Sequence, residues 1–268
     1  TALILDIFAS RAQTREGRLQ VELAQHEYLL PRLAGQWSHL ERLGGGIGTR
    51  GPGETQIETD RRLIRNRILK LKKDLESIRT HRNLYRERRR SSGVDVVGLV
   101  GYTNAGKSTL LNTLTKAGVA TDDKLFMTLD PVTRKLQLPN SKSILITDTV
   151  GFIQKLPTTL VAAFRATLEE IRETSAILHV VDITHPNAAQ HVSVVTEVLK
   201  DLDVNQTKSL LILNKADLLP SSANLEDISI LVPKRIHNDN GTPVSIVSAK
   251  NGTGISELLH SIQSILED

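Results

Sequence analysis

From residue 94 to the C-terminus, short apolar runs alternate with longer segments in which apolar residues recur every three or four positions. The short runs indicate buried strands, and the longer pattern is typical of amphipathic helices. The predicted strands are 94–100, 134–138, 143–147, 176–182, 209–214 and 243–248, and the predicted helices are 107–117, 158–173, 187–201 and 254–266. This alternation predicts an α/β fold, with a mostly parallel six-stranded sheet and helices on both faces.

The first third of the chain follows a different rhythm. Apolar positions spaced by four and three residues mark two stretches: Leu19, Leu23, His26, Leu30 and Leu33, then Ile64, Ile68, Leu71, Leu75 and Ile78, with the second rhythm running on through Arg82 to Tyr85. Such seams predict two helices packed as an antiparallel coiled-coil hairpin. Pro31 is expected to kink or close the first helix. Residues 1–8 are apolar and fit either a strand end or a helix start.

The two helical stretches are separated by residues 44–54, which hold six glycines and a proline in eleven positions. Composition alone favours a flexible linker. The position between two opposed helices, together with Arg50 and Glu54, instead indicates a hairpin tip. Ser91, Ser92 and Gly93 break the second helix, so we expect one domain over 1–92 and another over 93–268.

Composition restricts the classes of protein that fit. Of 268 residues, 39% are hydrophobic and 24% are charged, as in an ordinary globular protein. The chain has no cysteine, which excludes a disulfide scaffold and a cysteine metal site and fits a reducing compartment. No apolar run approaches the ~20 residues of a membrane span, and no signal-peptide pattern is present. Because residue 1 is Thr, we expect the chain to begin inside a larger protein.

Positive charge is concentrated in the second helical stretch. The whole chain has a net charge of +4, yet residues 57–90 alone hold 13 Lys and Arg against 5 Asp and Glu. A solvated helix face is the simpler interpretation, but few acids balance this run, which favours an RNA backbone as partner. The candidate RNA contacts are Arg50, Arg61, Arg62, Arg65 and Lys72.

Residues 101–108 match G-x-x-x-x-G-K-[ST], the phosphate-binding P-loop. A strand precedes the loop and a helix follows it, so free backbone N–H groups and the helix dipole would face an anion, which argues against a chance match. Lys107 would contact the β- and γ-phosphates, and the Ser108 hydroxyl would bind Mg²⁺. The expected nucleotide contacts here are Gly101, Tyr102, Thr103, Asn104, Ala105, Gly106, Lys107, Ser108 and Thr109.

Two further segments supply groups for the γ-phosphate and the metal. The stretch Asp148, Thr149, Val150 and Gly151 follows a predicted strand, so Asp148 would hold Mg²⁺ through water and the Gly151 amide would bond the γ-phosphate. Phe126, Met127 and Thr128 lie in a loop between these motifs, where Thr128 would give Mg²⁺ a second hydroxyl; Thr133 is the alternative. Lys107, Thr128 and Gly151 are the predicted catalytic residues.

The nucleotide base is predicted by two later strand ends. Asn214, Lys215 and Asp217 follow one strand, and Ser248, Ala249 and Lys250 follow another. The Asp217 carboxylate would accept two hydrogen bonds from guanine, a pattern that adenine cannot supply, and a backbone amide of the second motif would donate to guanine O6. GTP and GDP are therefore the expected ligands. Each motif alone also fits a surface turn.

Water activation is where the sequence departs from many GTPases. They place Gln directly after the glycine of the Asp-x-x-Gly motif, whereas this chain has Phe152, which has no donor or acceptor. We expect slow intrinsic hydrolysis that a partner stimulates. Asn104 would either help to hold K⁺ beside the phosphates or only stabilise the loop. Residues 156–173 are expected to form a switch that GTP orders.

Together these motifs resemble the HflX family, in the Obg–HflX group of translation-factor-type GTPases. The matching segments are GGGIGTRGPGETQ at 44–56, GYTNAGKS at 101–108, FMTLDP at 126–131 and DTVGF at 148–152. The resemblance covers the whole chain and implies a P-loop GTPase domain. It also implies a monomeric, cytoplasmic or organellar enzyme that binds the large (50S) ribosomal subunit and promotes ribosome splitting or recycling. Members usually carry a further N-terminal domain, so we expect residues 1–92 to hold only the end of that domain, followed by the helical hairpin.

Two other functions fit parts of the pattern. The chain would be a signalling switch if the hairpin bound another protein through its seam, without RNA. A membrane-remodelling GTPase fits less well, because the helices lack an apolar face to insert. Salt dependence separates the first two, since RNA binding weakens steeply with salt.

Overall fold

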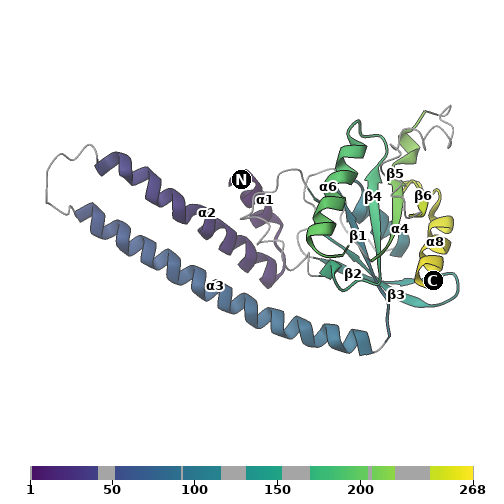
Figure 1. The fold of residues 1–268 in the computed structure, drawn as a ribbon, viewed down its shortest axis with the longest axis horizontal. Helices are drawn as coiled ribbons and strands as arrows, with labels where there is room; N and C mark the ends of the chain where they lie inside the picture. The colour runs from purple at the N-terminus through teal and green to yellow at the C-terminus, as the bar shows by residue number, and fades with distance from the viewer. Residues whose placement is uncertain are drawn as a thin grey trace. The chain divides into compact units, whose positions relative to one another are not determined.

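The structure is a computed structural model that describes residues 2–41, 52–91, 93–115, 131–152, 170–204, 207–220 and 242–267. These residues fall into two compact units (Figure 1). The first takes the helices up to residue 88, and the second takes the described residues from 89 onward.

The second unit is built on one sheet of six strands. In chain order they are β1 Val96–Gly101, β2 Val132–Gln137, β3 Ser143–Asp148, β4 Ala176–Asp182, β5 Lys208–Asn214 and β6 Val244–Ile246. Their spatial order is β2-β3-β1-β4-β5-β6, and every neighbouring pair is parallel except β2 with β3. The predicted α/β fold with a mostly parallel six-stranded sheet is confirmed.

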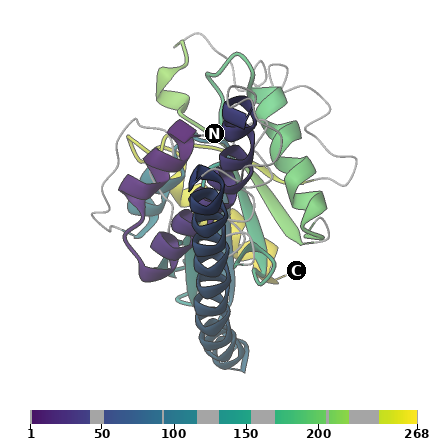
Figure 2. The same cartoon turned by 90° about the vertical axis from the view of Figure 1, so that its left-hand side faces the viewer.

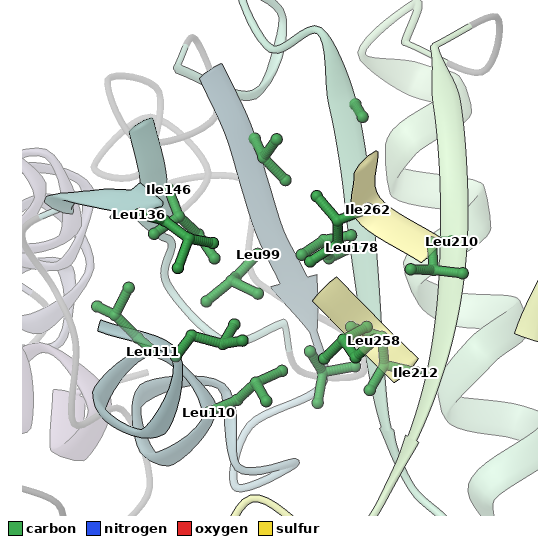
Figure 3. Close-up of a cluster of buried hydrophobic side chains, with 14 of the residues drawn as sticks. Leu99, Leu110, Leu111, Leu136, Ile146, Leu178, Leu210, Ile212, Leu258 and Ile262 are labelled. Atoms are coloured by element: carbon green, nitrogen blue, oxygen red, sulfur yellow. The ribbon is translucent and has the colours of Figure 1, made fainter. Parts of the chain in front are cut away.

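Helices cover both faces of this sheet. They are α4 Lys107–Thr115, α6 Ala188–Asp201 and α8 Ile255–Glu267, with a short 3₁₀ turn at Ala216–Leu218. Alternation along β4 explains the two layers: Leu178 packs with residues of α4 and α8 (Figure 3), whereas Ile177 packs with residues of α6. Of the predicted helix 158–173, only residues 170–173 lie within the described residues.

The first unit consists of helices α1 Ala2–Arg11 and α2 Arg15–Glu41 and most of α3 Pro52–Ser91. Figure 2 shows α3 as one continuous helix. The predicted seam is confirmed. Leu23 of α2 is buried against Ile68 and Leu71 of α3, and partly buried leucines and isoleucines extend the contact: Leu19, Leu30, Ile64 and Leu75. Ion pairs join Glu16 to Arg82 and Glu27 to Lys72, as antiparallel helices require. Of the predicted tip at 44–54, residues 44–51 lie outside the described residues, and residues 52–54 belong to α3.

Two open points at the N-terminal end are resolved. Within the described residues, 2–8 belong to helix α1 and not to a strand, and Leu5 and Phe8 are buried on the same face of that helix. Pro31 does not close α2, which continues to Glu41. A proline removes one backbone hydrogen bond, and the packed seam compensates for it. Across the described ranges, no helix has the length and apolar character needed to cross a membrane.

Candidate functional site

The P-loop connects β1 to α4 and holds a buried lysine. Lys107 is only 6% exposed, and its Nζ donates to the carbonyl oxygens of Gly101, at 3.2 Å, and Tyr102, at 3.1 Å. Burial lowers the pKa of Lys107, while the nearby Asp148 carboxylate raises it. The ammonium group is therefore fixed inside the loop, with its charge partly offset by a carboxylate from β3.

Two glycines of the motifs are required by close approaches of the backbone. Gly106 has a φ of +92°, and a Cβ there would collide with Nδ2 of Asn214. A Cβ on Gly151 would lie 2.8 Å from Cα of Thr103 and 3.0 Å from Nζ of Lys107. Larger residues at either position would therefore push the motifs apart.

The metal residues predicted at this end of the sheet lie together. Oγ of Ser108 donates to Oδ2 of Asp148 across 2.6 Å, and Asp148, at the end of β3, is 1% exposed. Thr149 next to it is buried and donates to the carbonyl oxygen of Leu99. A hydroxyl and a carboxylate are the oxygen ligands that Mg²⁺ prefers. The described residues thus fit a magnesium ion held between the P-loop and β3.

Phe152 is part of the hydrophobic core and also pairs with the P-loop backbone. Its N–H donates to the carbonyl oxygen of Gly101, and its own carbonyl accepts from the N–H of Thr103 at 2.8 Å. The side chain is 7% exposed and packs in a cluster with Val100, Ile171, Ile177, Val195 and Val204. A side chain held in this cluster cannot orient a water molecule in the site.

The two base motifs are tied to each other and to the P-loop. Asn214, 2% exposed, donates from Nδ2 to the carbonyl oxygen of Ala105, and its Oδ1 accepts from the N–H of Ala249. Oγ of Ser248 donates to Oδ1 of Asp217 at 2.7 Å. The turn after β6, the turn after β5 and the phosphate loop therefore form one connected network. That a backbone amide near Ala249 bonds guanine O6 stays a prediction.

The remaining predicted residues have simple positions. Thr109 lies in the first turn of α4, Val150 is buried, and Lys250 is exposed. Asn104 is exposed with a φ of +62°. Phe126, Met127, Thr128 and Arg50 lie outside the described residues. The alternative Thr133 is in β2, where its hydroxyl bonds that of Thr147.

Sequence reasoning missed three residues at the end of β4, in the turn after it and in α6: Asp182, His185 and His191. Asp182, the last residue of β4, pairs with Lys215 at 2.7 Å. Further along, the His191 ring stacks on Tyr102 of the P-loop, with centroids 3.7 Å apart and planes within 3°. His185 packs against His191 with centroids 4.3 Å apart. Burial and the neighbouring His185 lower the pKa of His191. The signal for Asp182 was present, because it follows an apolar strand as Asp148 does.

A second histidine lies behind the site. His179 is in β4, 8% exposed, and burial together with the Lys107 charge lowers its pKa to about 4. It is therefore neutral at physiological pH.

Part of the basic surface on α3 is neutralised within the hairpin. Lys72 pairs with Glu27 at 2.8 Å, and Arg67 and Arg82 pair with Glu22 and Glu16 of α2. The expectation that few acids balance these cations is wrong for this side of the helix, because the balancing acids come from the other helix and not from 57–90. Arg62 and Arg65 are exposed, and Arg61 is half-buried.

The fold and the network at the strand ends define a P-loop GTPase domain. Residues 96–215 match the family model of 50S ribosome-binding GTPases, and residues 11–89 match that of the GTP-binding GTPase middle region. GTPase HflX of Alkalihalophilus pseudofirmus is 60% identical over 217 residues, which are 81% of this chain and 51% of that protein. GTPase HflX of Caldanaerobacter subterraneus is 52% identical over 263 residues, 98% of this chain and 58% of that protein.

The chain belongs to the HflX family of GTPases, and it spans between half and three fifths of the length of these two relatives. A solved structure with a similar fold is a GTP-binding protein from the archaeon Sulfolobus solfataricus in complex with GDP. Its TM-score is 0.64 and its sequence identity 27%, and the match covers 99% of this chain and 71% of that one.

Proposed function

We propose that the protein binds GTP with Mg²⁺ at the carboxyl ends of β1, β3, β5 and β6 and hydrolyses it to GDP and phosphate. The observation that carries this proposal is the hydrogen-bonded network that joins the phosphate loop to both base motifs through Asn214. It supports a single site that recognises phosphate at one end and base at the other.

Each residue has a role in this proposal that follows from its position. Lys107 neutralises phosphate charge from a buried, fixed position. Ser108, and Asp148 through water, would hold Mg²⁺, and the ion when bound would neutralise phosphate charge. The backbone of Gly151 lies close to Lys107, and its amide would contact the γ-phosphate. Asp217, held by Ser248, accepts hydrogen bonds from guanine. Thr128 would complete the metal shell and is proposed on sequence grounds alone.

Hydrolysis by this site alone is slow in our proposal, because Phe152 belongs to the core and offers no polar group to the attacking water. A partner then aligns the water or moves this segment. We propose that the partner is the large ribosomal subunit, bound through ribosomal RNA, and that the complex promotes ribosome splitting. The family model of 50S ribosome-binding GTPases and the exposed cations Arg62 and Arg65 on α3 support this partner.

The location and state of the protein follow as part of the same proposal. We propose a monomer that works where ribosomes are, in a bacterial cytoplasm or an organelle interior. The domain boundary lies near residue 92, between a hairpin that contacts RNA and a domain that binds nucleotide. Asn104 would help to hold K⁺ beside the phosphates. A comparison of turnover in K⁺ and in Na⁺ tests this role.

Turnover measured with and without large ribosomal subunits tests the partner. We expect phosphate release to rise at least about tenfold with subunits, because transition-state groups supplied in trans are worth several kcal/mol. Equal rates with and without subunits would contradict the proposal. Sedimentation of the protein with the subunits in a GTP analogue, in GDP and without nucleotide then shows which state binds.

Charge reversal on α3 separates RNA binding from binding through the helix seam. The substitutions Arg61→Glu, Arg62→Glu and Arg65→Glu should abolish sedimentation with the subunit and leave the Kd for GTP unchanged. The matched control reverses three exposed lysines of the other unit: Lys135, Lys200 and Lys208. Lys72 is left out, because its pair with Glu27 makes it part of the hairpin itself.

The signalling alternative is disfavoured by the seam itself. Leu23, Ile68 and Leu71 are buried between α2 and α3 and are not available to another helix. RNA binding through phosphates should weaken steeply as salt rises, and Arg62→Glu or Arg65→Glu alone should reduce the slope of log K against log salt by about one for the phosphate that is no longer bound. A salt-independent association would favour the protein partner.

A further inference from the structure

Asp182 occupies a defined position between two strands that carry the site. It ends β4 and pairs in register with Asn214 of β5, the residue that ties the P-loop to the base motifs. Its Oδ2 lies 2.7 Å from Nζ of Lys215. Its Oδ1 accepts from both the N–H and the hydroxyl of Thr184, at 3.0 and 2.6 Å. Three donors thus fix the orientation of one carboxylate.

Lys215 is held in an unusual conformation at the other end of this pair. Its φ is +70°, in the left-handed region that is strained for a non-glycine residue. The strained turn lies between Asn214, which contacts the phosphate loop, and Asp217, which contacts Ser248. A flexible lysine stem starting at this point has many rotamers, and pairing its ammonium group with Asp182 selects one of them.

Stability alone is a weak reason for this pair. The side chains are only 15% and 23% exposed, so both ions have lost much of their hydration. Partly buried ion pairs often contribute little net stability, because desolvation offsets their attraction. The pKa of Asp182 is nevertheless lowered: burial alone would raise it, and hydrogen bonds from Lys215 and Thr184 outweigh that effect. The carboxylate is therefore ionised and available as a fixed anchor.

We propose that Asp182 is a positioning residue for guanine nucleotide binding, which holds the Lys215 side chain in place beside the nucleoside that Asp217 recognises. This inference rests on the proposed function. Asp182 itself touches no nucleotide and acts through Lys215. Lys215 lies in the same turn as Asp217, the residue proposed to contact the base. Loss of the Asp182 carboxylate should therefore weaken contacts with the nucleoside and leave contacts with the γ-phosphate unchanged.

The substitution Asp182→Asn tests this role, because it keeps the shape of the side chain and removes the charge. We expect the Kd values of GTP and GDP to rise equally, by about tenfold, as when a charged hydrogen bond is lost. The GTP-to-GDP ratio of Kd values and the turnover rate at saturating GTP should not change. Thr184→Val should give a smaller effect in the same direction, about twofold to threefold, because it removes one of the bonds that orient the carboxylate.

A double-mutant cycle distinguishes positioning from a structural role. In a Lys215→Met background, Asp182→Asn should change neither Kd, since the side chain that it positions is gone. The matched control is Asp95→Asn, which breaks the Asp95–Lys142 pair of 2.8 Å next to the other end of β1 and should leave both Kd values unchanged. Circular dichroism and melting temperature identify any variant that has unfolded.

Three results would overturn the inference. Unchanged Kd values in Asp182→Asn would show that Lys215 needs no anchor. Equal weakening in the presence and absence of Lys215 would show that Asp182 supports only the fold. A change in the GTP-to-GDP ratio would place its effect at the γ-phosphate. If the unaltered protein bound neither nucleotide, the proposed function itself would fail, whereas binding by that protein with no effect of Asp182→Asn would refute this inference alone.

Discussion

The strand ends of the GTPase domain and the long helix α3 both carry candidate functional residues, but they hold them in different ways. At the strand ends the side chains of Lys107, Asp148 and Asn214 are buried and bonded to neighbouring motifs. Along the described part of α3 the cations are mostly exposed, and three of them, Arg67, Lys72 and Arg82, are paired with acids of α2. A buried network specifies one ligand geometry, whereas an exposed charged face specifies only the sign of its partner. A single substitution should therefore be enough to weaken nucleotide binding in the domain. On the helix, the effect on RNA binding should grow with the number of charges that are changed.

The largest single effect is expected at the P-loop. Lys107→Ala should weaken GTP binding by about 1,000-fold, or about 4 kcal/mol, because the fixed ammonium group makes charge-assisted bonds to phosphate. Fluorescence titration with a labelled nucleotide measures it. Lys142→Ala, on an exposed lysine of the same domain, is the matched control and should bind as the unaltered protein does. A change of less than tenfold at Lys107 would show that the loop does not hold phosphate.

Truncating a buried leucine of the hairpin should lower its stability, whereas truncating an exposed leucine should not. Leu71 is fully buried in the seam, and Leu71→Ala should destabilise the hairpin by about 3 kcal/mol, because it removes buried apolar atoms and leaves a cavity. Leu69 is 66% exposed, and Leu69→Ala should change stability by less than about 0.5 kcal/mol. Thermal unfolding followed by circular dichroism measures both. If Leu71→Ala also lowered GTP affinity, the two regions would not be independent.

Acid should destabilise the GTPase domain through His179. Its pKa is about 4 in the folded protein and about 6.5 when unfolded, so the unfolded chain binds more protons between these values. The free energy of unfolding should therefore fall as pH falls through this window, by about 2 kcal/mol between pH 7 and pH 4.5. His179→Leu should remove that part of the loss, and His260→Gln, on the exposed side of α8, should retain it. Denaturant unfolding at several pH values tests this, and identical pH profiles for all three proteins would contradict it.

A smaller effect is expected at the aromatic stack on the P-loop. His191→Ala removes the ring that lies on Tyr102 and should loosen the loop, weakening nucleotide binding by about fivefold, or about 1 kcal/mol. His191→Phe keeps a flat ring and should restore most of the affinity. Equal Kd values for the alanine and phenylalanine variants would show that stacking has no part in holding the loop.

The nucleotide motifs could be predicted because each one follows an apolar strand, and parallel strands bring their ends to one edge of the sheet. Asn104, Gly106 and Lys107 needed only the P-loop spacing. The position of Asp182 at the end of an apolar strand was a usable signal, but its pair with Lys215 and the stack of His191 on Tyr102 could not be predicted, since no short motif marks these contacts and the partners are distant in sequence. The ion pairs of Glu16, Glu22 and Glu27 with α3 were missed for a related reason: charge was counted along one helix, whereas the pairing depends on the register of two. Phe152 was recognised as unable to orient water, but its place in the core required the structure.

Guanine selectivity is the most direct test of the proposed site, because it depends on Asp217, Ser248 and Asn214 acting as one network with the P-loop. Calorimetry at fixed Mg²⁺ compares GTP, GDP and ATP binding to the unaltered protein and to Asp217→Asn. Both guanine nucleotides should bind, and ATP should bind roughly 10⁴-fold more weakly, because adenine leaves the Asp217 carboxylate without its donors. Asp217→Asn should lose most of that preference. Equal affinity of the unaltered protein for GTP and ATP would contradict a guanine site at these strand ends.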